Sequence, residues 1–235
     1  MQWKMTAALA GAAVGAALFS GHAASAAVIA QYTATGNSFA ASTIVANASA
    51  GDLAPNPANS NAVLQAQSNG YASSGSTSGD PEYWFTPNGT TASSTNATSA
   101  LSAGAYVSFT VTPANGYQMN LSSLTFNVAR GGGATPRGYV VRSSADSYAA
   151  NLAAADVATQ RPTYTPVSID LSGAAFQGLT SAFTVRLYGY TPGTGQSLDT
   201  DDVTLNGTVS AVSVPEPASL GLLALAGLGL LARRR

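Results

Sequence analysis

A period-two alternation of apolar and polar residues, which runs through the second half of the chain, constrains its fold most strongly. Apolar side chains stand at Val107, Phe109 and Val111, with polar side chains between them. The same alternation recurs in four later stretches, at residues 124–128, 167–171, 183–187 and 203–209. Because successive side chains of a strand point to opposite faces, this spacing predicts strands with one buried face.

Turn signals separate these predicted strands. Asn115-Gly116 lies between the first two, and Gly131-Gly132-Gly133 follows the second. Several short strands joined by turns predict an antiparallel β-sandwich, and we favour a jelly roll. The expected fold class is therefore all-β, a jelly-roll-like antiparallel sandwich with an N-terminal signal helix and a C-terminal hydrophobic helix.

The region Tyr32–Gly104 carries weaker signals, because Ser, Thr, Asn, Ala and Gly dominate it. Short apolar stretches predict edge strands joined by long loops, at Thr43–Val45, Ala62–Leu64 and Tyr83–Phe85. A polar low-complexity linker is the alternative for Gly70–Gly79 and Thr90–Ser99. Ala145–Ala158 is the only stretch between the chain's two ends with helical composition, and it predicts one or two helical turns.

Residues 218–232 near the C-terminus carry no charge and are rich in Leu. As a helix they span roughly 22 Å, whereas a bilayer core is about 30 Å thick. The segment can still cross if the bilayer thins locally and Arg233 snorkels. Arg233, Arg234 and Arg235 then hold the end in the cytoplasm by the positive-inside rule. The alternative is a buried helix of a soluble domain, which the lack of a polar face disfavours.

The N-terminus has the pattern of a secretory signal peptide. Lys4 provides the positive region, Thr6–Phe19 the apolar region, and Ala24-Ser25-Ala26 a cleavage site. An uncleaved anchor is the alternative. We therefore expect three parts: a signal peptide at 1–26, a β-sandwich surface domain at 27–213 and a sorting tail at 214–235. The expected partners of the ends are signal peptidase, the secretion machinery and the inner membrane.

The tail resembles the PEP-CTERM sorting signal of Gram-negative bacteria. The resemblance rests on Val214, Pro215, Glu216 and Pro217, on the Leu/Gly/Ala run and on the closing arginines. It implies recognition by an exosortase, which removes the tail and passes the protein to the cell surface or the extracellular space. It also implies a link to exopolysaccharide and biofilm formation. Residues 105–209 more loosely resemble a body module of PEP-CTERM surface proteins.

The predicted domain lacks the residues of most catalytic sites. The chain has no Cys, and its one His and only Lys, His22 and Lys4, lie in the signal peptide. This excludes Ser-His-Asp triads, Cys-His pairs, Ser-Lys dyads and His or Cys zinc sites. Residues 27–213 hold five positive and nine negative side chains, a net of −4. Such a body is a poor match for the nucleic-acid backbone, so we expect no nucleic-acid partner.

Carboxylates are the remaining candidates for chemistry. The stretch around Asp199, Asp201 and Asp202 resembles the last strand of jelly-roll carbohydrate-binding modules, where an acidic residue from an early strand often completes a structural Ca²⁺ site. Asp80 and Glu82 are the candidate early partners. A solvated acidic loop is the plainer interpretation. A glycosidase pair built from the same carboxylates is a further alternative.

Aromatic residues leave two functions open. They occur at Tyr83, Trp84, Phe85, Tyr188 and Tyr190. Exposed aromatic faces would stack on sugar rings, whereas core packing is their commoner use. We expect that the protein is not an enzyme and that it binds no cofactor other than the hypothetical Ca²⁺. The expected function is an exported surface or extracellular-matrix protein processed by an exosortase. The alternative is a jelly-roll carbohydrate-binding module that grips polysaccharide.

Overall fold

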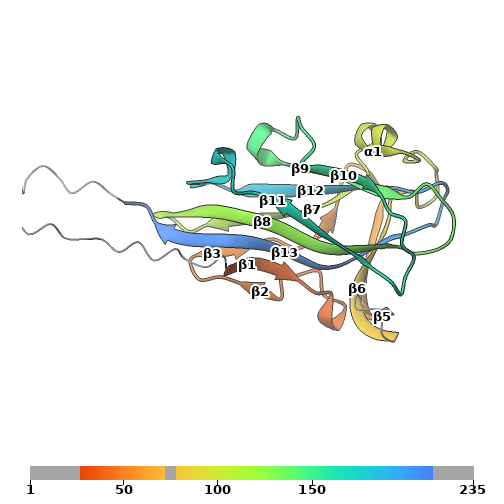
Figure 1. Cartoon of the computed structure of the whole chain (residues 1–235), viewed down its shortest axis with the longest axis horizontal. Helices are drawn as coiled ribbons and strands as arrows, with labels where there is room; N and C mark the ends of the chain where they lie inside the picture. The colour runs from red at the N-terminus through yellow and green to blue at the C-terminus, as the bar shows by residue number, and fades with distance from the viewer. Residues whose placement is uncertain (1–26, 72–77, 214–235) are drawn as a thin grey trace, which may run out of the picture.

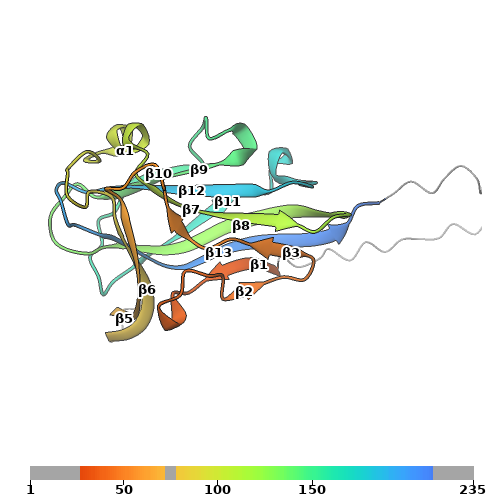
Figure 2. The ribbon, with the colours of Figure 1, turned by 180° about the vertical axis from the view of Figure 1, so that it is seen from behind.

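The computed structural model describes residues 27–71 and 78–213, which form two antiparallel sheets packed face to face (Figures 1 and 2). Sheet A contains β1 (Ala27–Tyr32), β2 (Thr43–Ile44), β5 (Val63–Tyr71), β6 (Ser78–Thr86), β8 (Tyr117–Arg130), β11 (Thr165–Asp170) and β13 (Leu198–Ala211). Sheet B contains β3 (Ala48–Ala50), β4 (Ala54–Pro55), β7 (Tyr106–Pro113), β9 (Gly138–Ser143), β10 (Ala153–Asp156) and β12 (Phe183–Tyr190).

The strand order is that of a jelly roll. Four strands of sheet A run β1-β13-β8-β11, and four strands of sheet B run β7-β12-β9-β10. From β7 to β13 each successive strand lies in the other sheet, except that β10 follows β9 in sheet B and pairs with it. The predicted antiparallel sandwich is therefore confirmed, and the alternating stretches from residue 107 onward form its central strands.

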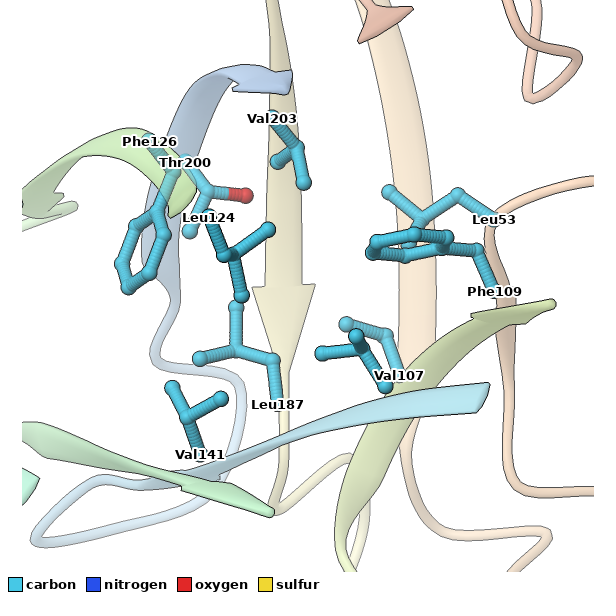
Figure 3. A pocket seen from close by; sticks show the side chains of 10 residues that line it. Leu53, Val107, Phe109, Leu124, Phe126, Val141, Leu187, Thr200 and Val203 are labelled. Carbon is cyan, nitrogen blue, oxygen red and sulfur yellow. The ribbon is translucent and has the colours of Figure 1, made fainter. Parts of the chain in front are cut away.

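The core lies between the sheets because the alternation places one face of each strand there. Val107, Phe109 and Val111 of β7 are buried and face Leu124 and Phe126 of β8. Figure 3 shows the side chains around a small apolar cavity of about 10 Å³ in this layer. Thr200 of β13 is the one polar residue among the ten that line it.

Strand β13 has an edge that two other strands share. β8 pairs with β13 along almost all of its length, whereas the opposite edge pairs first with β6, at Leu198–Thr200, and then with β1, at Val203–Gly207. The register with β8 shifts between these two stretches, and Asp202 adopts a left-handed φ of 52°. Asp tolerates this conformation better than most residues, so the bulge forms where the sequence supplies Asp201 and Asp202.

The helix lies elsewhere than predicted. Residues 145–158 form the end of a single 3-10 turn, η2 (Ser144–Asp146), and strand β10. The α-helix of the described chain is α1 (Ala97–Ala103), which begins inside the stretch Thr90–Ser99, for which a linker was the alternative, and extends beyond it. Asn96 and Ser99 form a capping box at its start, and Gly104 ends it in a left-handed conformation. Two further 3-10 turns are η1 (Thr35–Asn37) and η3 (Ala174–Phe176).

The weaker N-terminal signals correspond to strands β2, β5 and β6. The β5–β6 hairpin lies at the end of the sandwich where β13 begins, away from Ala211 (Figure 2). Within residues 27–71 and 78–213 no helix is long and apolar enough to cross a membrane. The predicted signal peptide and the predicted C-terminal tail lie outside the described residues.

Candidate functional site

The candidate site lies on the outer face of sheet A, where β6 and β13 pair. Asp199 stands opposite Trp84 across this pair, while their neighbours Leu198 and Phe85 point into the core. Because directly paired residues share a face, Trp84 and Asp199 point outward together. Glu82, two residues from Trp84, lies on the same outward face. One face of β6 therefore closes the core and the other carries polar groups.

The segment at residues 157–164, between β10 and β11, brings two side chains across this outer face. It is held against the end of β8 by hydrogen bonds in which Arg130 N donates to Thr159 O at 2.8 Å and Arg161 N donates to Arg130 O at 3.1 Å. Arg161 Nη1 then lies 3.3 Å from Asp199 Oδ2 and 3.9 Å from Glu82 Oε1. Tyr164 donates its hydroxyl to Glu82 Oε2. The segment thus covers both carboxylates.

Burial disfavours the charged forms of Glu82 and Asp199, because it removes their carboxylates from water. Glu82 and Asp199 are 0 % exposed, whereas 22 % of the Arg161 side chain is exposed. Burial raises the pKa of Asp199 to about 7, and the neighbouring Glu82 raises it too, whereas Ser197, Arg161 and Arg137 oppose the rise. Arg161 also lies over the Trp84 ring, 4.5 Å from its centroid, as a cation–π pair.

Two more arginines, Arg137 and Arg130, lie near Arg161. Arg137 donates through Nε to Ala134 O, and its Nη2 donates to Gln196 Oε1 at 2.9 Å. Arg130 donates through Nη1 to Gly133 O and through Nη2 to the main chain of the covering segment. Burial lowers the pKa of Arg137; Asp199 opposes this, while Arg130 and Arg161 add to it. Arg130 and Arg137 therefore lie in the same region as Arg161.

A cleft of about 390 Å³ opens over this region. Its walls include side chains from five parts of the chain, namely Gln65, Trp84, Arg137, Arg161, Gln196 and Ser197. Gly131 forms part of the wall, and a Cβ there would lie 1.9 Å from Ser197 Oγ and 2.9 Å from Asp199 Oδ1. Only glycine therefore fits at residue 131 without displacing the site.

The structure brings together some of the carboxylates proposed as calcium ligands. Glu82 and Asp199 meet at Arg161, while Asp201 and Asp202 lie at the β13 bulge, where Asp202 N donates to Asp201 Oδ1 at 2.8 Å. In the described part of the chain, no three His, Cys, Asp or Glu side chains form a group that could hold a metal ion. The calcium site stays a prediction, as does the glycosidase pair. A thermal melt with Ca²⁺ and then EDTA tests the first, and identical midpoints reject it.

The aromatic residues divide between core and cleft. Tyr83 and Phe85 are fully buried in the core, and Tyr188 and Tyr190 are 5 % exposed beneath α1. Trp84 is half-buried and lines the cleft. Sequence reasoning did not find Arg161, Tyr164 or Gln65 as site residues. The scarcity of arginine in residues 27–213 was the one signal that could have directed attention to Arg161.

Three solved structures illustrate what this chain is similar to. One is an arabinose-bound α-L-arabinofuranosidase, with 13 % identity and a TM-score of 0.43 over 77 % of this chain; the chain spans 27 % of that enzyme's length. Another is the K1 adhesin domain of Lys-gingipain from Porphyromonas gingivalis, with 12 % identity and a TM-score of 0.41. The match covers 78 % of this chain and 98 % of the adhesin domain. A third is a protein from Bacteroides thetaiotaomicron that is described as sugar-binding, with 13 % identity and a TM-score of 0.41. The match covers 71 % of this chain and 90 % of that protein.

The sequence comparisons point to the C-terminal tail. No curated protein matches the sequence. A family profile described as the PEP-CTERM protein-sorting motif matches residues 213–235. This stretch contains the Val214-Pro215-Glu216-Pro217 lead and the three arginines on which the resemblance was based. The chain therefore carries a PEP-CTERM protein-sorting motif at residues 213–235.

Proposed function

We propose that this chain is an exported, non-enzymatic protein of the cell surface or extracellular matrix, processed by an exosortase at its PEP-CTERM motif. The observation that carries the proposal is the position of the matched motif. Strand β13 ends at Ala211, Val212 N donates to Gly116 O at 2.8 Å, and the motif begins at residue 213. A folded sandwich is thus joined almost directly to a sorting signal.

The chemistry of the sandwich supports a non-enzymatic role. Residues 27–213 contain no His, Lys or Cys. They therefore lack the cysteine nucleophile and the His and Lys bases that usually activate a catalytic Ser or Cys. The buried carboxylates Glu82 and Asp199 are both within ion-pair distance of Arg161. Acidic groups neutralised in this way serve packing or binding rather than proton transfer to a substrate.

The proposed route follows from the two ends of the chain. Signal peptidase removes residues 1–26 after export by the secretion machinery, and residues 214–235 hold the precursor in the inner membrane with Arg233, Arg234 and Arg235 on the cytoplasmic side. The exosortase then releases the protein to the surface, where we place it with exopolysaccharide in a biofilm.

The route is tested by changing the motif lead in the producing cells. With Pro215→Ala, Glu216→Ala and Pro217→Ala combined, we expect the protein to remain in the inner-membrane fraction with its tail intact, as measured by fractionation and intact mass. Ser210→Ala, an exposed change outside the motif, is the matched control. Normal release of the triple variant, or normal processing in cells without the exosortase, contradicts the proposal.

A second candidate function is carbohydrate binding, and one observation favours it. A cleft of about 390 Å³ contains a half-buried tryptophan beside amide and guanidinium groups. Ligand sites of about 300–1,000 Å³ commonly combine an apolar surface with a few polar groups that orient the ligand. Such a module would hold the exported protein on polysaccharide without catalysis.

A further inference from the structure

We propose that the cleft at Trp84 binds the carboxylate-bearing sugars of an acidic polysaccharide, an inference that rests on the carbohydrate-binding candidate above. The ligand class is a polymer of uronic acids or of similarly carboxylated sugars. The ligand is thus negatively charged, and side chains of the cleft hold it.

The distribution of charge carries the first step. Residues 27–213 have only five arginines against nine acidic side chains. Two of the five, Arg137 and Arg161, line the cleft, and Arg130 lies beside them, hydrogen-bonded to the main chain at residues 158–161. Glu82 and Asp199 lie within ion-pair distance of Arg161, and these two carboxylates and the three arginines together carry a net charge of +1 even with both carboxylates ionised. A positive hollow on an acidic body attracts anions to this one place.

The hydrogen bonds of the arginines carry the second step. Arg137 donates to two main-chain carbonyls and to the neutral amide of Gln196. Arg130 donates to the carbonyls of Gly133 and Ala158. Neutral acceptors orient a guanidinium without cancelling its charge. The positive field of both groups therefore reaches a ligand in the cleft, and guanidinium is well suited to carboxylates.

The other walls suit a sugar. Gln65, Gln196 and Ser197 present amide and hydroxyl groups, which both donate to and accept from sugar hydroxyls. Trp84 adds an apolar surface, and its Nε1 has no hydrogen-bond partner in the described chain. A flat aromatic group beside hydroxyl-binding side chains and a positive field fits a carboxylated sugar better than an isolated inorganic anion.

Nucleic acid is the competing anionic polymer, and the body disfavours it. A phosphate backbone needs a run of basic groups along its length, because each contact neutralises one of many closely spaced charges. Here the positive region is confined to one cleft, while residues 27–213 carry a net of −4. A polymer with one carboxylate per sugar, held at a single cleft, matches this arrangement.

The test compares one polymer in two charge states. The exported protein, purified from its producing cells, is titrated with oligogalacturonate and with the same oligomers after reduction of their carboxyl groups to neutral alcohols. We expect the acidic form to bind at least about tenfold more tightly, with an affinity that falls as salt is raised. Double-stranded DNA at the same salt is expected to bind at least about tenfold more weakly than the oligogalacturonate.

A variant locates the site without disturbing the fold. Gln65 is exposed on β5 opposite Trp84, so Gln65→Glu adds a negative charge to the cleft without burying it. We expect it to weaken oligogalacturonate binding about tenfold and to leave the reduced oligomers unaffected. Ser49→Glu, an exposed site on β3 of sheet B, adds the same charge elsewhere and should leave both affinities unchanged.

The outcomes separate the two proposals. Equal binding of acidic and reduced oligomers overturns the acidic ligand and leaves carbohydrate binding standing. Binding of neither overturns both the ligand and the carbohydrate-binding candidate, while exosortase sorting is judged by the fractionation above. A loss that is equal in Gln65→Glu and Ser49→Glu, or comparable binding of DNA, overturns the assignment of the cleft.

Discussion

The two outer faces of the sandwich are covered by opposite chemistry. On sheet B, helix α1 lays Ala100 against Val140, Tyr188 and Tyr190, and Figure 1 shows α1 on the side of the sandwich where β9 and β12 lie. On sheet A, residues 157–164 lay Arg161 over two buried carboxylates. One cover is held by the removal of apolar surface from water and the other by ion pairs.

This difference separates stability from function. Apolar burial is favourable wherever it occurs and changes little with pH or salt near neutrality. A buried ion pair recovers its desolvation cost only in good geometry, and a well-packed apolar group often stabilises more. The charged cover of sheet A is therefore a poor device for stability alone, and it is the cover that borders a polar cleft.

The largest expected effect comes from removing the charge that holds the sheet A cover. Arg161→Gln leaves Glu82 and Asp199 without their guanidinium partner, and we expect a loss of about 3–5 kcal/mol in the free energy of unfolding, measured with urea at pH 7. Arg186→Gln is the control on sheet B, where the guanidinium lies 3.6 Å from the Tyr148 ring centroid. It should cost about 1 kcal/mol; equal losses would contradict the contrast.

The apolar cover should show a large effect of a different kind. Tyr188→Ala removes a ring that is 5 % exposed and 5.0 Å from the Tyr106 ring centroid. We expect a loss of about 3 kcal/mol that is the same at pH 5 and pH 8 and at low and high salt. Tyr188→Phe, which keeps the ring, is the control. A loss that varies strongly with salt would show that the two covers are alike.

The raised pKa of Asp199 gives a prediction with a definite sign. Its pKa rises from 3.8 to about 7 on folding, so between these values the native state binds the proton more tightly. Stability from this group is complete below about pH 4 and is lost as the pH rises toward 7. Asp199→Asn removes that loss. We expect the variant to be roughly 1–3 kcal/mol more stable than the parent at pH 8, since a tenfold change in proton affinity corresponds to about 1.4 kcal/mol.

Asp170, whose pKa is lowered instead of raised, is the control for the pH dependence predicted for Asp199. The hydrogen bond from Ser172 lowers the pKa of the exposed Asp170. Its contribution is present above the unfolded pKa and lost as the pH falls. Asp170→Asn should therefore lose stability at neutral pH and not at acid pH, as followed by thermal melts from pH 3 to pH 8. Parallel profiles of the two variants would contradict the assignment of Asp199.

The smallest expected effect lies between the sheets, away from both covers. Thr200→Val replaces a hydroxyl on the wall of the apolar cavity with a methyl group of similar size (Figure 3). We expect a gain of up to about 1 kcal/mol, because the hydroxyl is kept from water there. Val185→Thr, on the facing wall, makes the reverse change and should lose a similar amount. A loss in Thr200→Val would show that its hydroxyl stabilises β13.

The strands were predictable because each buries one face. Val107, Phe109 and Val111 repeat with a period of two, and the repeat survives in any tertiary arrangement that covers this face. Helix α1 was not predictable in this way. Its seven residues carry no long apolar stripe, and it forms because Asn96 and Gly104 cap it and Ala100 has tyrosines to pack against.

The candidate site was predictable only in part. Glu82 and Asp199 were identified as a possible early and late carboxylate pair, and the structure brings them together. Their partner Arg161 comes from a segment with no strand or helix signal, and its position depends on main-chain hydrogen bonds to the end of β8. Local patterns carry no information on such long-range pairing, which depends on how the sheets are ordered.

By itself the sequence determined the two matters that depend on local pattern: a β-sandwich, from the alternation of its side chains, and a PEP-CTERM sorting motif, from residues 213–235. Tertiary structure alone decided which polar groups share a face. The pairing of Trp84 with Asp199, and the shared edge of β13, place Glu82, Arg161 and the cleft together. The reason is physical: alternation depends on neighbours in the chain, whereas a binding site depends on neighbours in space.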